Sequence, residues 1–431
     1  MTAPGKEWQF EVAVVGGGPG GASAATTLAQ RGRSVVVLEK ERFPRFHIGE
    51  SQLPWSNDVF EALGVRETIA SAGFVQKWGA SFRTLDGRAE RYADFAAAVE
   101  TPMPQTFQVR RAEFDDLLLR HAAKSGADVR EGHRVLEATF DTDGVTLRIE
   151  RADGHAPTLR VAAVVDASGR TALITKRMGR HEKDPLLRNI AVYAHYEGIP
   201  RASGRRGGDI RMLTRRDMGW IWLIPISDAV TSVGAVVPQG VHALEAKATP
   251  EKSLLHYLAT TVGGPPLMKE ARRISPARFE ADYSYLGTRL SGDRWVAVGD
   301  AAGFLDPIFS TGVLLAMQAG IDAATALDRG LADGDLGASR FSAYERKVRR
   351  RYHHFRRFAI GFYDPAFRDL WFTPSSRFGL YEAVLSVLAG NWRPSLATRL
   401  RIAVFFLLVR LQRHLPLAPR VAQTIASGET P

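Results

Sequence analysis

Three glycines near the start of the chain are spaced to bind a phosphate. The stretch VVGGGPGGASAA places Gly16, Gly18 and Gly21 in a G-x-G-x-x-G pattern between a strand pattern and a helix pattern. The first glycine allows a tight turn, the second lets the backbone approach a pyrophosphate, and the third lets the helix pack on the strand. Glu39 ends the next predicted strand, about 20 residues on, where a carboxylate binds ribose hydroxyls. The spacing predicts a dinucleotide site; the alternative is a glycine-rich turn that binds nothing.

Two tryptophans stand side by side on a predicted strand. In GWIWLIPI, residues 219–226, the period of a strand puts Trp220 and Trp222 on one face and Ile221 and Leu223 on the other. Tryptophan favours half-buried strands, so core packing is one interpretation. The other interpretation is a wall between two compartments of an active site.

Other motifs indicate which dinucleotide binds. VAVGDAAGFLDP resembles a segment of FAD-dependent oxidoreductases in which an aspartate binds the flavin ribityl chain, and Asp300 matches it. QVRRAEFDDLLL looks like the helix start that brings an arginine, here Arg111, near the flavin. DASGR, residues 166–170, resembles a further strand–turn element of this superfamily, with an ordinary turn as the alternative. The resemblance implies FAD, with the following expected contacts: Gly16, Gly18, Gly21, Ala22, Glu39, Lys40, Glu50, Arg111, Asp300 and Val313.

Four motifs together resemble the flavin-dependent halogenases. GWIWLIPI matches the W-x-W-x-I-P motif of that family in full and is the most specific of the four. FHIGESQLP is similar to a loop near the flavin, FVQKWGASF resembles the segment with the catalytic lysine, and FLDPIFSTGVLLA is similar to the halide loop. These alignments place the lysine at Lys77 and the halide at the amides of Thr311 and Gly312, where a helix begins. A simple N-cap by Ser310 or Thr311 is the alternative for the last motif.

The resemblance implies that reduced FAD, supplied by a separate flavin reductase, uses oxygen and chloride or bromide to produce hypohalous acid. This oxidant has to be enclosed. The Lys77 ammonium would polarise it by a hydrogen bond, or the neutral amine would itself be halogenated. Phe74, Trp78 and Phe82 flank the lysine and favour its burial, whereas an exposed surface lysine is the alternative. Trp220 and Trp222 would keep the organic substrate away from the flavin while the small oxidant passes.

One departure from the family bears on the substrate. Tryptophan halogenases have a glutamate just before the Ser-Thr-Gly of the halide loop, and this chain has Phe309. A carboxylate there would help to activate the oxidant or stabilise a cationic ring. Its absence favours an electron-rich ring, a phenol or a pyrrole, either free or tethered to a carrier protein. The sequence does not identify a general base.

The order of the patterns predicts an α/β fold: an FAD-binding Rossmann-like domain, an inserted mixed β-sheet domain on the substrate side, and a C-terminal helical region. The boundaries expected for these parts are 8–76, 105–186 and 280–330 for the FAD-binding domain, 77–104 and 187–279 for the inserted sheet, and 331–431 for the basic helical region.

The composition is that of a folded protein, with 45% hydrophobic residues and a net charge of +11. The chain has no cysteine, which excludes disulfides and thiolate chemistry. YERKVRRRYHHFRRF, residues 344–358, is strongly basic, and no acidic residue lies between positions 383 and 428. A solvated helix face is the simplest interpretation. An acidic carrier protein is the next, and an anionic membrane under LRIAVFFLLVRLQ is less favoured.

No nucleic-acid module and no metal-ligand pattern accompanies the charge, and His353 and His354 are expected to be packing or surface residues. No apolar run reaches the roughly 20 residues of a membrane-spanning helix, and we expect a cytoplasmic protein. Two other functions use the same motifs. One is an aromatic hydroxylase or isoprenoid reductase, and the other is a non-catalytic flavoprotein that docks an acidic partner.

Overall fold

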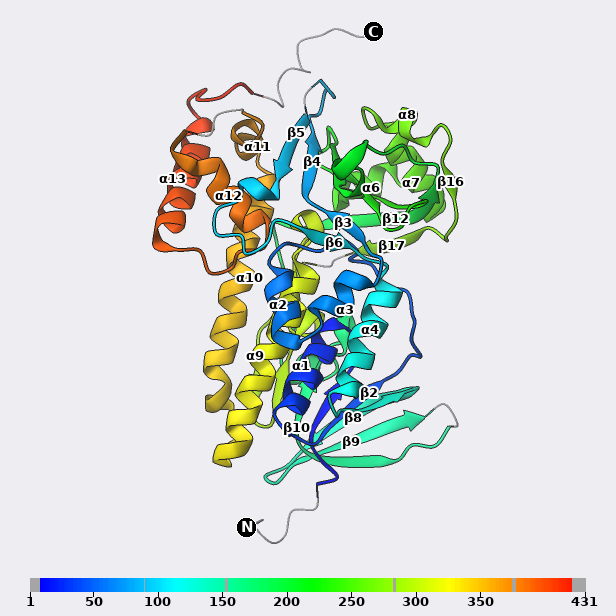
Figure 1. Ribbon diagram of the computed structural model, residues 1–431, viewed down its shortest axis with the longest axis vertical. Helices are drawn as coiled ribbons and strands as arrows, with labels where there is room; N and C mark the ends of the chain where they lie inside the picture. Colours follow the sequence, from blue (N-terminus) through cyan, green and yellow to red (C-terminus); the bar gives the residue numbers. More distant parts are fainter. Residues whose placement is uncertain (1–7, 89, 152–153, 282–283, 374–376, 421–431) are drawn as a thin grey trace.

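The computed structural model describes residues 8–88, 90–151, 154–281, 284–373 and 377–420. Two eight-stranded sheets occupy the lower and upper parts of the molecule in Figure 1, and the C-terminal helices run along one side of both. The predicted fold class, an FAD-binding Rossmann-like part with a mixed sheet and a C-terminal helical region, is confirmed.

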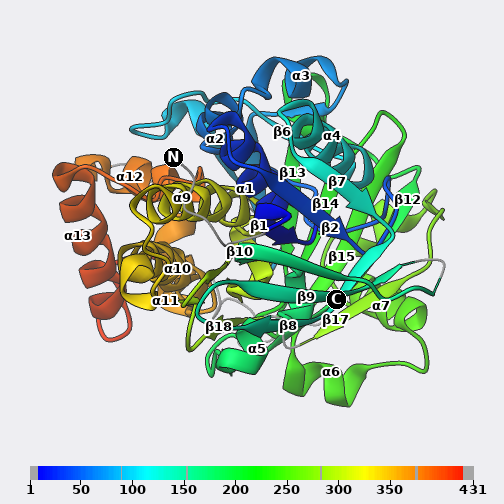
Figure 2. The same cartoon turned by 90° about the horizontal axis from the view of Figure 1, so that it is seen from below.

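The lower sheet is built on continuous runs of valine, as parallel strands buried on both faces require. β1 (Phe10–Val15) pairs in parallel with β2 and with β10, so that Val14 lies opposite both Val37 and Val165. A hairpin, β8–β9, continues from β10 in antiparallel fashion (Figure 2). The other strands of this sheet are β2 (Val35–Glu39), β7 (Asp128–Glu131), β8 (His133–Phe140), β9 (Val145–Arg151), β10 (Thr158–Asp166), β19 (Ser291–Gly292) and β20 (Trp295–Ala297).

Long helices cover this sheet. α1 (Pro19–Gln30) packs directly on α9 (Gly312–Asp333). Gly320 permits this close approach, since a Cβ there would lie only 2.4 Å from the carbonyl oxygen of Gly20. α9 begins at Gly312, where the sequence predicts the start of a helix. The remaining helices on this part are α2 (Ser56–Leu63), α3 (Arg66–Ser71), α4 (Arg111–Lys124) and α5 (Thr175–Met178).

The upper sheet contains the tryptophan strand, β14 (Trp220–Pro225), at its centre. Trp220, Trp222 and Ile224 face the core shared with the C-terminal helices. Ile221 and Leu223 face the opposite core, under α7, so the predicted alternation is confirmed. The other strands are β4 (Gly79–Arg83), β5 (Glu90–Asp94), β12 (Asn189–Glu197), β13 (Ile210–Thr214), β15 (Val230–Pro238), β16 (Arg272–Arg273) and β17 (Arg278–Ala281).

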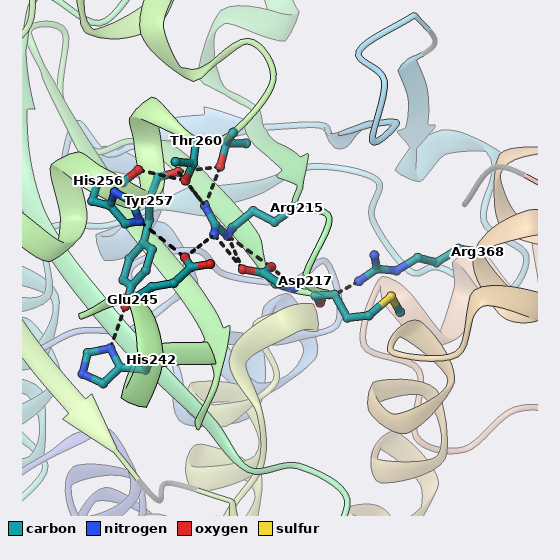
Figure 3. A network of polar contacts seen from close by, with 11 residues as sticks. Arg215, Asp217, His242, Glu245, His256, Tyr257, Thr260 and Arg368 are labelled. Atoms are coloured by element: carbon teal, nitrogen blue, oxygen red, sulfur yellow. Dashed lines mark hydrogen bonds and ion pairs between the residues drawn. The ribbon is translucent and has the colours of Figure 1, made fainter. Parts of the chain in front are cut away.

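The turn that enters β14 is fastened from two sides (Figure 3). Arg215, only 5% exposed, donates to the Tyr257 carbonyl at 2.6 Å and pairs with Asp217 at 2.6 Å. Arg368, from the C-terminal helices, donates to the carbonyl of Met218 at 3.0 Å. The register of the two tryptophans is therefore held by both layers that enclose the sheet.

The C-terminal helices are α10 (Ser342–Phe362), α11 (Pro365–Phe372), α12 (Leu380–Leu388) and α13 (Leu396–Gln412). They share one hydrophobic core with the tryptophan face of the upper sheet. Three short helices lie near the outer face of that sheet: α6 (Gln239–Glu245), α7 (Pro250–Ala259) and α8 (Gly264–Met268). Two small sheets complete the fold, β3 (Val75–Lys77) with β6 (Thr106–Gln108), and β11 (His181–Lys183) with β18 (Tyr285–Gly287) and β21 (Gly303–Phe304).

The domain boundaries remain a prediction. β17 pairs with β12 and ends at Ala281, two residues past residue 279, where the inserted sheet was expected to end. Positions 374–376 and 421–431 of the predicted basic region lie outside the described residues.

Candidate active site

The glycine loop follows β1 and leads into α1. Gly16 adopts a φ of 107°, and a Cβ there would lie 2.3 Å from the carbonyl oxygen of Ala167. A Cβ on Gly21 would lie 2.0 Å from the carbonyl oxygen of Gly16. Gly18 precedes the first turn of α1 and has only the Arg45 side chain near its Cβ position, at 3.5 Å. The first and third glycines are therefore required by packing, and the second leaves the loop open.

Glu39 closes this loop from the next strand. Its carboxylate is buried and accepts the N–H of Gly17 at 2.7 Å and the N–H of Glu41 at 2.8 Å. The side chain thus orients the glycine loop, a role that the motif alone did not indicate. Each carboxylate oxygen keeps acceptor capacity for a second donor, so ribose binding at Glu39 remains a prediction.

A cavity of about 590 Å³ lies beside the loop and extends to the tryptophan strand. This volume is within the range of about 300–1,000 Å³ that is usual for cofactor sites. Most of the residues predicted from the sequence line it: Gly16, Gly18, Gly21, Glu39, Lys40, Glu50, Arg111, Trp220, Trp222, Asp300, Gly312 and Val313. Ala22 does not, because it packs in a core with Leu118 and Met317. Lys77 and Thr311 are not among the residues that line the cavity either.

Arg111, which lines the cavity, belongs to a buried ion pair. Arg111 holds Asp115 with two hydrogen bonds, at 2.7 and 2.8 Å. Burial alone would raise the pKa of Asp115, but the Arg111 charge keeps it below its ordinary value. Burial raises the pKa of Asp300 to about 6, against the opposing charges of Arg111 and Arg170. A hydroxyl-bearing ligand that donates a hydrogen bond would stabilise the Asp300 carboxylate.

The predicted halide loop ends at the start of α9. Ser310 takes a φ of 56°, and Thr311 precedes the first helical residue without forming a side-chain cap. Thr311 is 1% exposed, and its hydroxyl has no hydrogen-bond partner among the described residues. The alternative for this motif, a side-chain N-cap, is therefore not formed by Thr311, and the unpaired donors of the first helical turn remain for an anion. A Cβ on Gly312 would lie 3.3 Å from the Phe304 ring, which leaves little room for a side chain.

Lys77 is buried, as its aromatic neighbours predict. It is 2% exposed, and its Nζ donates to Ser51 Oγ at 2.8 Å and to the Gln52 carbonyl at 2.9 Å. The Phe95 ring lies 5.2 Å from the amine. Burial lowers the pKa of Lys77 to about 7, although Asp209 opposes the shift. Both protonation states of the amine are therefore accessible near neutral pH.

Ser51 joins the lysine to the cavity. It lines the cavity and accepts the hydrogen bond from Lys77. Its neighbour Gln52 is 1% exposed, and neither polar atom of its amide has a partner within the described part of the chain. The indole N–H of Trp55 is also unpartnered there. Buried polar groups without partners are costly, so these side chains are suited to contact a polar ligand. We call the group of Lys77, Ser51, Gln52 and Trp55 the lysine compartment.

The two tryptophans form part of the cavity wall and are held by hydrogen bonds. Trp222 Nε1 donates to Ser232 at 3.2 Å, and the two indole rings lie 5.8 Å apart. Trp220 Nε1 donates to Tyr363 at 2.9 Å, and the Tyr363 hydroxyl donates to the buried carboxylate of Asp306 at 3.0 Å. Asp306 also lies in the halide-loop motif. The wall is therefore linked both to that loop and to the C-terminal helices.

Sequence reasoning missed several of these contacts. Ser51 and Gln52 lie in FHIGESQLP, which was predicted to form a loop near the flavin, but their contact with Lys77 was not predicted. His195 pairs with Glu50 at 2.7 Å, and Tyr363 joins Trp220 to Asp306, but no local pattern marks either residue. Both partners come from elements that are distant in sequence. Phe309, where tryptophan halogenases have glutamate, is 7% exposed and packs its ring against Phe362.

The basic run of α10 is largely engaged by the rest of the molecule. Arg349 donates to the carbonyl of Thr288 at 2.8 Å, and Arg351 pairs with Asp322 at 2.5 Å. Arg356 pairs with Asp184. His354 is hydrogen-bonded to the carbonyl of Asn391 at 3.1 Å. Within the described ranges, no group of three or more potential metal ligands is found, and no helix is long and apolar enough to cross a membrane.

Known proteins resemble this chain over most of its length. The sequence model of the Tryptophan halogenase family matches residues 11–102 and 84–372. A 1H-pyrrole-2-carbonyl-[peptidyl-carrier protein] chlorinase of Pseudomonas fluorescens is 33% identical, over 79% of this chain and 80% of its own length. The corresponding brominase of Pseudoalteromonas luteoviolacea is 32% identical, over 78% and 81%. The myxobacterial chondrochloren halogenase CndH superposes with a TM-score of 0.78 at 32% identity, over 98% of this chain and 94% of that one.

The fold and the glycine-loop cavity define an FAD-dependent oxidoreductase. The matches are more specific, and the chain belongs to the flavin-dependent halogenases. It is an enzyme of that type, with FAD as cofactor and a halide as co-substrate.

Proposed function

We propose that this enzyme halogenates an electron-rich aromatic ring, a phenol or a pyrrole, and that Lys77 delivers the oxidant from the flavin cavity to that ring. The observation that supports this role is the position of Ser51, which lines the cavity and accepts the hydrogen bond of the buried lysine. A buried amine that reaches the cavity through one hydroxyl is suited to meet a small oxidant.

When FAD is bound and reduced, it would supply, together with oxygen, the two-electron oxidant that converts chloride or bromide to hypohalous acid. The cofactor would be held by Gly16, Gly18, Glu39, Arg111 and Asp300 around the cavity. A separate flavin reductase would reduce it. The halide would lie at the amides of Thr311 and Gly312, beside the unpartnered Thr311 hydroxyl.

The residues of the lysine compartment would then direct an electrophilic substitution on the ring. Hypohalous acid gives its halogen to a ring carbon, the ring loses a proton, and the oxygen leaves as water. Lys77 acts in one of two ways. Its ammonium donates a hydrogen bond to the departing oxygen, or its neutral amine first exchanges a proton for the halogen and then passes the halogen on. The side chains of Trp220 and Trp222 would keep the ring away from the cofactor.

Two observations favour the substrate class. Phe309 leaves the halide loop without the carboxylate that tryptophan halogenases have there, so the ring must itself stabilise positive charge. The chlorinase and the brominase that match this chain act, by their names, on pyrrole-2-carbonyl groups bound to a peptidyl carrier protein. A carrier-tethered aromatic acyl group is therefore our first candidate, and a free phenol is the second.

Product analysis tests this function. Purified protein with reduced FAD, oxygen and bromide should convert a pyrrole-2-carbonyl carrier protein or a simple phenol into products with the bromine isotope pattern. The rate should depend on bromide. Hydroxylated products that form without bromide would show instead that the enzyme is an aromatic hydroxylase. Reduction of an isoprenoid double bond would assign it to the reductases of the same fold, and inertness toward all of these with FAD bound would indicate a non-catalytic flavoprotein.

A further inference from the structure

α13 is apolar on two opposite sides. A helix advances 100° per residue, so residues at spacings of three and four share one face. The face toward the core carries Thr398, Ile402, Phe405, Val409 and Gln412, all buried. The opposite face carries an outer stripe of Leu396, Leu400, Val404, Leu407 and Leu411, each between 38% and 83% exposed. A solvent-facing helix normally presents polar side chains there, so this stripe indicates a surface that is covered in the working enzyme.

The surroundings of the outer stripe are positive. Arg399 and Arg410 follow one edge of it, and Arg401 lies toward the other. None of these arginines forms an ion pair within the part of the chain that the structure describes. No acidic residue occurs between positions 383 and 428 of the sequence. An occupant of the stripe should therefore be apolar at its centre and negatively charged at its rim.

This charge pattern distinguishes three kinds of occupant. A second copy of the chain would bring its own arginines against these, and like charges across an interface oppose association. A membrane surface is less favoured, because the stripe is wholly aliphatic and lacks the tryptophan and tyrosine that are enriched at lipid interfaces. An acidic protein with a small apolar patch satisfies both the stripe and its basic edges.

The position of α13 connects the stripe to the lysine compartment. The helix begins after a turn whose Trp392 ring packs edge-on against Trp55, with ring centroids 5.1 Å apart. The amide of Trp55 donates to the carbonyl of Ala389 at 3.1 Å. Three residues earlier, the carbonyl of Gln52 accepts the hydrogen bond of Lys77. The segment that leads into the outer stripe thus packs on the loop whose Gln52 carbonyl holds the lysine.

We infer that the outer stripe of α13 is the docking surface for an acidic carrier domain, which presents the aromatic acyl group as a thioester to the Lys77 compartment. This inference rests on the proposed function and adds to it the surface and the charge of the partner. It places the carrier on α13 and not on the basic run of α10, since several basic groups of α10 pair with the body of the enzyme.

Two double variants test the inference. Leu400→Ser with Leu407→Ser removes the apolar centre, and Arg399→Glu with Arg410→Glu reverses one basic edge. The probe is a pyrrole-2-carbonyl peptidyl carrier protein, and each rate is divided by the rate on a free phenol. We expect both variants to raise KM for the loaded carrier by at least about tenfold, and calorimetry to show the same loss of affinity. Wild-type binding should weaken as salt is added.

The matched controls are Leu244→Ser and Arg180→Glu, whose parent side chains are 89% and 78% exposed elsewhere on the molecule. If the controls raise KM as much as the double variants do, the surface is not a specific docking site. If the leucine variant instead abolishes binding to phosphatidylglycerol vesicles, or dissociates a dimer seen by light scattering, the occupant is a membrane or a second copy. Absence of any halogenated product contradicts the proposed function, while calorimetry still decides whether the carrier docks.

Discussion

The flavin cavity and the lysine compartment meet at Ser51 but are built in different ways. In the cavity, Glu39 has a backbone partner for each of its oxygens, and Gly16 and Gly21 leave no space for a side chain. In the lysine compartment, the amide of Gln52 and the indole N–H of Trp55 have no partner within the described residues. The flavin cavity is therefore fixed for one cofactor. The lysine compartment keeps polar groups that a substrate would satisfy.

The substitution Lys77→Met should separate the two compartments most strongly. The thioether nearly matches the volume of the lysine chain but has no amine to hold or polarise the oxidant. We expect halogenation to fall by about a hundred- to ten-thousandfold, which is the usual cost of losing a positioned acid–base group. FAD affinity and peroxide release should remain, because the cavity lining does not include Lys77. Retained halogenation would show that the lysine is not the relay.

The pH dependence of the wild-type enzyme identifies the active form of the amine. If the ammonium is required, halogenation should fall as the pH rises through about 7, and if the neutral amine is required, it should rise there. Stability gives an independent readout. Between pH 7 and 10.5 the unfolded chain binds the lysine proton more tightly than the folded one, so stability should increase with pH. Relative to Lys77→Met, urea denaturation should show a gain of up to about 5 kcal/mol across this window.

The difference between the compartments also explains what the sequence predicted. The glycine loop, Glu39 and Asp300 lie within short motifs, because a strand, a turn and a helix start fix their positions locally. The alternation of Trp220 and Trp222 followed from the period of a strand alone. Such features need no knowledge of distant packing, and all of them line the cavity.

The lysine compartment depends on contacts between distant segments. Lys77 was identified by resemblance, but its partners Ser51 and Gln52 come from another loop, and Phe95 follows β5, which pairs with the strand after Lys77. Tyr363, at the C-terminal end of α10, reaches Trp220 across 143 residues of sequence. The C-terminal region was predicted only as basic and helical, and its helices complete the core of the tryptophan face. Tertiary packing of this kind leaves no periodic signal in the sequence.

A smaller effect is expected from displacing Trp222, which we propose as part of the wall between the compartments. A Cβ on Gly234 would lie 2.2 Å from the Trp222 ring, so Gly234→Ala must displace that indole. Overpacking of this kind costs about 1–3 kcal/mol of stability. We also expect more peroxide or free hypohalous acid per halogenated product, because the oxidant would escape past the shifted ring.

A control on the opposite face of the same strand isolates this role. Val233 is fully buried in the core under α7, so Val233→Ala should lower stability by about 1 kcal/mol without changing the ratio of lost oxidant to product. If both variants leave that ratio unchanged, Trp222 contributes packing and no barrier.

The smallest effect tests whether the lysine compartment is prepared for a substrate. Gln52→Leu removes an amide whose two polar atoms are buried without partners, so the free enzyme should become more stable by about 1–3 kcal/mol. At the same time KM for the aromatic substrate should rise, because the hydrogen bonds that the amide offers are lost. Gln108→Leu is the matched control, since Gln108 is equally buried but its amide nitrogen donates to the carbonyl of Gly208 at 3.1 Å, and only its amide oxygen lacks a partner among the described residues. That variant should gain less stability than Gln52→Leu, because it also loses a hydrogen bond. If Gln52→Leu is also destabilising, the Gln52 amide is already satisfied in the free enzyme, and the contrast between the two compartments is smaller than the protein contacts indicate.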